Sequence, residues 1–479
     1  MPSLSLSSAC TKTTQLQKGK RRLTDLALDC LRLDIVNSQE TNNKNKNNKS
    51  NDNLNQRKMS RTYEFPPTLN PIAYTIVIHV PFFAFILLSL KPVTSKPLTF
   101  ILCIITVVQA LIPFIYHGKY DPLMHFNTAV FATFYSFKMM IWLKKNYQSS
   151  VNSKVKVPSF IGSLCNWRLK SVTIPDESKY QKYIDSIKFS DLNRKMINNT
   201  IKLIIKSLLL ELLSEYLKNN EPIISKRSYG LRVLDYLRTG HPFIETYTFF
   251  FCILYIIRAI LFFSQSWNVY CIIYGIILRP LLSNDIDKNK DKNRKQREES
   301  TSLKKIIKEW LILSIFYTKP LIGHPYFSTS PRDLWSNQWH QLYNQFFQEF
   351  GYLPIRNYFK HNETLGHVLG ICCSFMISGL FHEYLAIVSF SYFSIDYITF
   401  FLFHGILYVL WEIVGNILGR GKDFKDSFGI KVFKFSLFMP IAIFILPLFV
   451  EPYIKGLYIE SHLNIYTNLT KWWSNWKTI

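Results

Sequence analysis

The chain has 479 residues, of which 48% are hydrophobic and 16% aromatic, and its formal net charge is +25. The apolar residues form long runs that a soluble core rarely requires, and the basic residues cluster in loops and tails beside these runs. This pattern favours contact with anionic lipid headgroups or a phosphorylated cofactor and argues against nucleic-acid binding. The eight cysteines show no C-x-x-C spacing, which argues against a disulfide framework or a zinc site.

The two ends of the chain differ from its middle. Residues 1–65 are rich in Asn and Lys and lack the apolar content needed to offset chain ordering, so we predict a disordered tail. No apolar run follows its charges, as a secretory signal would require. We predict one helical membrane domain over 66–455, with a charged low-complexity loop at 283–301, and a C-terminal tail at 456–479.

Apolar runs of sufficient length to cross about 30 Å of hydrocarbon as helices recur through the middle of the chain. The clear runs are 72–90, 98–116, 126–143, 246–263, 368–393, 398–418 and 432–450. Shorter or ambiguous runs lie at 201–217, 269–282 and 306–317. We therefore expect an all-α, polytopic membrane protein with about seven to ten transmembrane helices. The distribution of basic residues leaves the orientation in the membrane open.

A helix is predicted to begin at Ser330, because Ser is a good N-cap, Pro331 suits the first helical position and Asp333 suits the third. From that register the apolar stripe is Trp335, Trp339, Leu342 and Phe346, and the polar stripe is Asn337, His340, Gln341 and Asn344. The helix is too polar to span and rich in Trp. We predict that it lies in the bilayer interface with its polar stripe facing a cavity; the alternative is a purely structural anchor.

The most informative residue is His382, which interrupts the apolar run 368–393 together with Glu383. An ionisable side chain at bilayer depth is costly unless it is used or satisfied, so His382 is a candidate functional residue. Most of its neighbours on the same helix face are small: Ser378, Gly379, Leu385 and Ala386. We expect a groove that lets a substrate reach the imidazole. The alternative is close helix packing, with His382 hydrogen-bonded to another helix.

Three segments in this order resemble the wax synthase branch of the membrane-bound O-acyltransferases. They are KPLIGHPYFSTSPRDLWSNQWHQ at 319–341, SFMISGLFHEY at 374–384 and FFLFHGILYVLWEIVG at 400–415. The resemblance covers about residues 300 to 450 and implies a helical fold of this family. It also implies transfer of a fatty acyl group from acyl-CoA to the hydroxyl of a long-chain alcohol or related hydroxylated lipid.

The resemblance also implies roles for residues of this chain. The family's intramembrane histidine corresponds to His382, which would act as general base, and its second polar position corresponds to His340. Members commonly carry basic residues before the Trp-His pair, whereas this chain has Ser336, Asn337 and Gln338, so Asn337 is an alternative for the second role. The further assignments are substrate contacts at Trp335, Trp339, Ser378, Gly379 and Glu383, and an acyl-CoA contact at Arg332.

The resemblance implies acyl-CoA as a co-substrate, with no permanently bound cofactor and no metal. The expected partners are a hydroxylated lipid and membrane lipids, and a homo-oligomer remains open. The expected location is the endoplasmic reticulum membrane. Alternative acceptors are a sterol, a diacylglycerol or a specialised alcohol.

Two hypotheses of another class remain. One is a transporter or channel that uses His382 and Glu383 as a path, although no internal repeat supports it. The other is a catalytically silent scaffold on the same fold. His404 also lies in an apolar run and is a weaker candidate for substrate contact.

Overall fold

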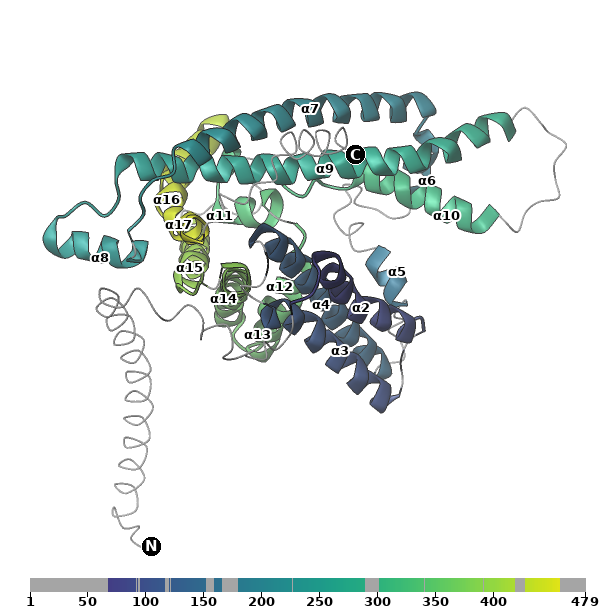
Figure 1. Cartoon of the computed structure of the whole chain (residues 1–479), viewed down its shortest axis with the longest axis horizontal. Helices are drawn as coiled ribbons and strands as arrows, with labels where there is room; N and C mark the ends of the chain where they lie inside the picture. Colours follow the sequence, from purple (N-terminus) through teal and green to yellow (C-terminus); the bar gives the residue numbers. More distant parts are fainter. Residues whose placement is uncertain are drawn as a thin grey trace, which may run out of the picture. The chain divides into compact units, whose positions relative to one another are not determined.

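The computed structural model of the chain describes residues 68–91, 93, 95–116, 120, 122–151, 159–165, 180–225, 227–288, 301–339, 341–390, 392–417 and 427–456 (Figure 1). All of them belong to the second of the two units into which the chain divides, Thr68–Ile479. The predicted tail at 1–65 lies outside the described residues, as do His340 and nearly all of the predicted tail at 456–479.

Helices account for almost all of the described chain, and no strand occurs within those ranges. The N-terminal half comprises α2 (Pro71–Leu88), α3 (Lys96–Ile115), α4 (Pro122–Val151), α5 (Phe160–Cys165), α6 (Tyr180–Ser186), α7 (Phe189–Asn219), α8 (Tyr229–Thr239) and α9 (Thr246–Lys288). After these come α10 (Thr301–Ile312), the π-helical η3 (Leu313–Tyr317), the short η4 (Pro325–Phe327), α11 (Pro331–Asp333), the π-helical η5 (Leu334–Gln338), α12 (Asn344–Phe347), the π-helical η6 (Gln348–Tyr352) and α13 (Leu353–Tyr358). The last helices are α14 (Glu363–Phe390), α15 (Asp396–Ile417), α16 (Phe428–Phe444) and α17 (Pro447–Lys455).

Six segments of the described chain are long and apolar enough to cross a membrane, which confirms a polytopic all-α membrane protein. They are Pro71–Leu88, Lys96–Ile115, Thr246–Ser283, Glu363–Phe390, Asp396–Ile417 and Phe428–Lys455. The predicted crossing at 126–143 lies within α4, which is long enough but less apolar than these six. Polar side chains such as His125, Lys138 and Asn146 are buried on α4, which packs against α2, α3 and α14.

The clear run 246–263 and the shorter run 269–282 form one continuous helix, α9. α9 also continues to Lys288, into the predicted loop at 283–301, of which residues 289–300 lie outside the described chain. The polar residues near position 264 tolerate helix because α7 packs alongside and bonds to them (Figure 1). Lys206 donates to Ser264 Oγ at 2.6 Å, and Arg258 donates to Ser214 Oγ at 2.9 Å.

The predicted helix start at Ser330 is confirmed, because its hydroxyl accepts from the backbone N–H of Asp333 at 3.1 Å. The predicted continuation to Phe346 is wrong. η5 ends at Gln338, and Trp339 has extended backbone angles. The cause is long-range: Gly323 N–H donates to the Gln338 carbonyl at 2.8 Å, and Gln341 N–H donates to the Leu321 carbonyl at 3.2 Å.

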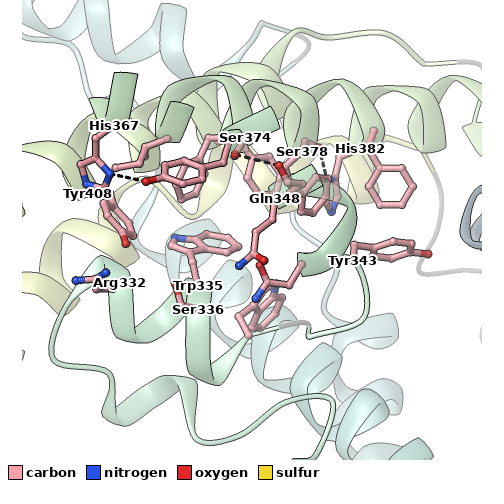
Figure 2. A pocket seen from close by; sticks show the side chains of 18 residues that line it. Arg332, Trp335, Ser336, Tyr343, Gln348, His367, Ser374, Ser378, His382 and Tyr408 are labelled. Carbon is pink, nitrogen blue, oxygen red and sulfur yellow. Dashed lines mark hydrogen bonds between the residues drawn. The ribbon is translucent and has the colours of Figure 1, made fainter. Parts of the chain in front are cut away.

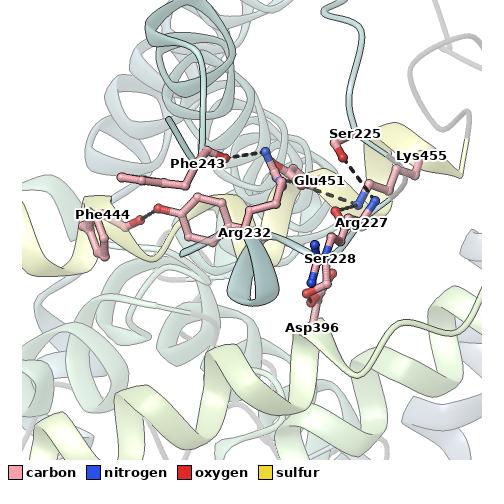
Figure 3. Close-up of polar contacts among 10 residues, drawn as sticks. Ser225, Arg227, Ser228, Arg232, Phe243, Asp396, Phe444, Glu451 and Lys455 are labelled. Atoms are coloured by element: carbon pink, nitrogen blue, oxygen red, sulfur yellow. Dashed lines mark hydrogen bonds and ion pairs between the residues drawn. The ribbon is translucent and has the colours of Figure 1, made fainter. Parts of the chain in front are cut away.

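A buried set of charges ties α8 to α17 (Figure 3). The Glu451 carboxylate is fully buried and pairs with the guanidinium of Arg232 and, at 3.5 Å, with the amine of Lys455. Arg232 also donates to the Phe243 carbonyl at 2.7 Å. Nearby, Ser228 donates to a carboxylate oxygen of Asp396 at the start of α15. These contacts hold the start of α15 and the middle of α17 beside α8.

Replacing Arg232 with Met should lower the stability of the protein, because it removes the closer cation from a carboxylate that no water reaches. Removal of one partner from a buried ion pair costs about 3–5 kcal/mol. The matched control is Arg194→Met, whose pair with Asp191 is exposed and worth about 0–1 kcal/mol. Thermal unfolding in detergent measures both. Equal unfolding midpoints for the two variants would contradict a stabilising role for the Arg232–Glu451 pair.

Candidate functional site

A cavity of about 370 Å³ lies between α14 and the segment from α11 to η6 (Figure 2). Its walls are largely aromatic, with polar groups at both ends and along one side. The lining residues are Arg332, Trp335, Ser336, Trp339, Tyr343, Asn344, Phe347, Gln348, Tyr352, His367, Ile371, Ser374, Phe375, Ser378, Phe381, His382, Phe401 and Tyr408. The volume and mixed lining are those of a small-molecule site.

His382 lines one end of this cavity and has a defined orientation. Its Nδ1 lies 2.8 Å from the carbonyl oxygen of Ser378, one helical turn earlier on α14. A carbonyl oxygen only accepts hydrogen bonds, so Nδ1 carries the proton and, in the neutral ring, the lone pair is on Nε2. The rings of Phe401 and Phe449 lie 4.6 and 5.5 Å from the imidazole, centroid to centroid, and hold its plane.

Several predicted site residues meet at the cavity and others do not. Arg332, Trp335, Trp339 and Ser378 line it together with His382. Three others are not among the lining residues: Asn337, Gly379 and Glu383. The side chain of Asn337 instead donates to Asp333 at 3.3 Å. His340 lies outside the described residues.

Gly379 lies where α14 meets α15. A Cβ at this position would stand 2.7 Å from the Cα of Ile398, so only glycine permits this approach. Ala386 is buried in the same region, in a cluster with Tyr397. The small residues around His382 thus serve two purposes, since Ser378 borders the cavity while Gly379 and Ala386 allow close helix packing.

Glu383 holds the start of α15. Its carboxylate accepts from the backbone N–H groups of Tyr397 at 3.1 Å and Ser394 at 3.5 Å, and the side chain is buried. A carboxylate is favoured at a helix N-terminus, where backbone N–H groups lack helical partners. Between these donors lies Ile395, whose φ of 63° is strained for a β-branched residue. Glu383 therefore stabilises a strained turn and faces different surroundings from His382.

A second polar centre lies at the cavity end opposite His382. The His367 ring is hydrogen-bonded through Nδ1 to the Tyr352 hydroxyl at 2.8 Å and donates through Nε2 to the Glu412 carboxylate at 2.7 Å. Glu412 also pairs with Arg332 at 3.4 Å. The sequence analysis did not select His367 as a candidate site residue. The available signal was Glu412, an acid within the apolar run 398–418, and His367, which immediately precedes the run 368–393. Each of these side chains needs a partner.

His404 is almost completely buried and is not among the cavity-lining residues. Its Nδ1 lies 3.0 Å from the Phe400 carbonyl, and its ring stands 5.1 Å from that of Trp335. Trp335 also contacts Phe375 and Phe401, so its indole packs within the protein. Its Nε1 is buried and has no hydrogen-bond partner in the part of the chain that the structure describes.

The segment from Tyr343 to Tyr352 runs along α14 and forms the opposite wall. The Tyr343 ring lies 4.8 Å from that of Phe381, and the Ser374 hydroxyl donates to the Phe347 carbonyl at 3.2 Å. Burial raises the pKa of the Tyr343 phenol well above its ordinary value, so the group stays neutral. This wall is therefore anchored to α14 at two points, Phe381 and Ser374, which lie about two turns apart.

Comparison with protein families gives one match over this region. Residues 318–403 match the family model described as the membrane bound O-acyl transferase family. The matched range contains the α11–η6 wall, all of α14 and the start of α15. None of the curated proteins compared with the chain matches it. The six apolar helices and the family match support an integral membrane protein and, in general terms, a membrane-bound acyltransferase.

Replacing Glu383 with Ala should destabilise the α14–α15 junction, because buried N–H groups left without an acceptor cost about 1–3 kcal/mol. Glu383→Gln should lose less, since the amide oxygen still accepts. The exposed Glu215→Ala on α7 is the matched control. Unfolding midpoints in detergent report the order. An equal loss for Gln and Ala would show that the negative charge, and not hydrogen-bond acceptance, holds the turn.

Proposed function

We propose that the protein is an acyl-CoA-dependent O-acyltransferase that transfers a fatty acyl group to the hydroxyl of a long-chain alcohol or related hydroxylated lipid, as in the wax synthase branch. The observation that carries the proposal is the cavity at His382, where the bond from Nδ1 to the Ser378 carbonyl leaves Nε2 as a proton acceptor. The family match over 318–403 supports acyl transfer in general.

The reaction follows from the chemistry of that nitrogen. His382 Nε2 takes the proton of the acceptor hydroxyl while the hydroxyl oxygen forms a bond to the thioester carbonyl carbon. The carbonyl oxygen then carries the negative charge. When the C=O bond re-forms, the C–S bond breaks, and the departing thiolate takes the proton from the imidazolium. The products are an ester and free CoA, and His382 returns to its starting state.

The two ends of the cavity suit the two parts of an acyl-CoA. Arg332 is largely exposed at one end, where a guanidinium attracts phosphate, and its ion pair with Glu412 holds it there. The aromatic residues Phe381 and Phe401 surround the His382 end, where alkyl groups are favoured. Under this proposal Trp335, Trp339 and Ser378 contact substrate.

The membrane location is part of the proposal. Acyl chains and long alcohols reside in the bilayer, so a site among membrane helices receives them without transfer through water. The endoplasmic reticulum is the proposed membrane. The second polar role proposed from the resemblance stays with His340, because Asn337 points to Asp333.

The central test is His382→Ala in the purified full-length protein with labelled acyl-CoA and a panel of alcohols. Loss of a general base should lower kcat by at least about 10²-fold. The matched control is His361→Ala, an exposed histidine before α14, which should behave as wild type. Ester formation by a folded His382→Ala protein at the wild-type rate would remove this residue from the mechanism.

Ser378→Leu should obstruct the cavity beside His382. If the added methyl groups cost the bound substrate about 1–3 kcal/mol, as overpacking does, kcat/KM should fall about 5- to 160-fold. The control is Met376→Leu, on the outward face of the same helix. The measurement is kcat/KM for acyl chains of increasing length. Unchanged values across the series would show that substrates do not pass Ser378.

A further inference from the structure

The wall opposite α14 carries six side-chain amides between Asn337 and Gln348, and four of them are hydrogen-bonded within the protein. Asn337 and Gln338 each donate to Asp333 at 3.3 Å. Gln341 donates to the Ser336 carbonyl at 3.0 Å, and Gln345 accepts from Lys138 at 3.3 Å. These four amides are engaged in holding the segment together.

The remaining two, Asn344 and Gln348, line the cavity. Among the described residues neither side chain has a hydrogen-bond partner, although each offers two N–H donors and one oxygen acceptor. Figure 2 shows the Gln348 side chain extending into the space between Trp335 and Ser378. Asn344 is half-buried and Gln348 is exposed, and both line the cavity, so a polar group of a ligand that enters it can hydrogen-bond to either amide.

The spacing of these two residues allows them to act on one atom. Asn344 and Gln348 are four positions apart in a helical stretch, with αR angles at Tyr343 and Gln348, so their side chains share one face about 5–6 Å apart at Cβ. Donors placed in this way can approach a single oxygen from two sides.

Their position is beside the reacting end of the cavity. The rings of Tyr343 and Phe381 lie 4.8 Å apart, centroid to centroid. Asn344 directly follows Tyr343, and His382 directly follows Phe381, so Asn344 lies at the level of His382 along α14. The bond from Ser374 to Phe347 places Gln348 about two turns of α14 away from His382, toward the N-terminus of α14. An oxygen bound between the two amides therefore lies on the side of His382 from which the cavity extends.

We propose that Asn344 and Gln348 form a two-amide oxyanion hole that serves the reaction at His382. This inference rests on the proposed acyl transfer. When the hydroxyl oxygen bonds to the thioester carbon, the carbonyl oxygen gains the charge, and the Nδ2–H of Asn344 and the Nε2–H of Gln348 donate to it. The interaction strengthens in the transition state, so it acts on kcat more than on KM.

The test uses Asn344→Leu and Gln348→Met in the full-length protein, with Asn219→Leu and Gln181→Met as controls at exposed amides on α7 and α6. Each site variant should lower kcat about 10²- to 10³-fold, as removal of one oxyanion donor does. The affinity for a thioether analogue of acyl-CoA, which has no carbonyl oxygen, should not change. The nearly isosteric Asn344→Asp should also lose kcat, because a carboxylate repels the developing charge.

Two results would overturn the inference. One is a kcat equal to that of the controls, and the other is a loss of thioether affinity that accounts for the whole loss of activity. The His382→Ala variant separates this inference from the proposed function. If His382→Ala is inactive while Asn344→Leu and Gln348→Met match the controls, the oxyanion role fails and acyl transfer stands. If no variant and no wild-type protein forms ester, the proposed function itself fails.

Discussion

The hydrogen bond from His382 Nδ1 to the Ser378 carbonyl is the constraint on which the site depends. It uses an acceptor that belongs to α14 itself, so the imidazole is oriented by its own helix and fixed in one tautomer. The rings of Phe401 and Phe449 then close on it from α15 and α17. Those helices are held by buried polar contacts, since Glu383 binds the start of α15 and Arg232 binds Glu451 on α17. The chemistry at Nε2 thus rests on charges that lie outside the cavity.

Helical periodicity predicts which residues share a face but not which neighbour approaches that face. It correctly places Ser378 on the same side of α14 as His382. It places Gly379 there too, yet α15 packs against Gly379, and the cavity borders Ser378 but not Gly379. The start at Ser330 is predicted because capping is local, within three residues. The end at Gln338 is not predicted, because it depends on backbone bonds to Leu321 and Gly323, which a one-helix pattern does not contain.

Polar residues in or beside apolar runs have different roles, which also depend on the neighbouring helices. Each polar side chain is costly in the membrane without an interaction partner, but the sequence does not show which residue is that partner. Glu383 accepts hydrogen bonds from backbone N–H groups, and Glu451 pairs with two cations. His367 is hydrogen-bonded to Glu412, 45 residues away. His382 differs because its Nδ1 is bonded within its own helix and its ring borders a cavity. Tertiary packing alone separates a structural acid from a candidate catalytic base.

The polarity of the cavity restricts how a substrate lies in it. Along α14, His367 and His382 are 15 positions apart, or about 22 Å at 1.5 Å per residue. Asn344 and Gln348 lie between these ends on the opposite wall. A wholly apolar chain across both amides would remove the hydrogen bonds that they make to water and offer none in return. The cost is about 1–3 kcal/mol for each amide. Alkyl groups are therefore favoured against Phe381 and Phe401, while the polar atoms next to the reacting carbonyl are favoured beside the amides.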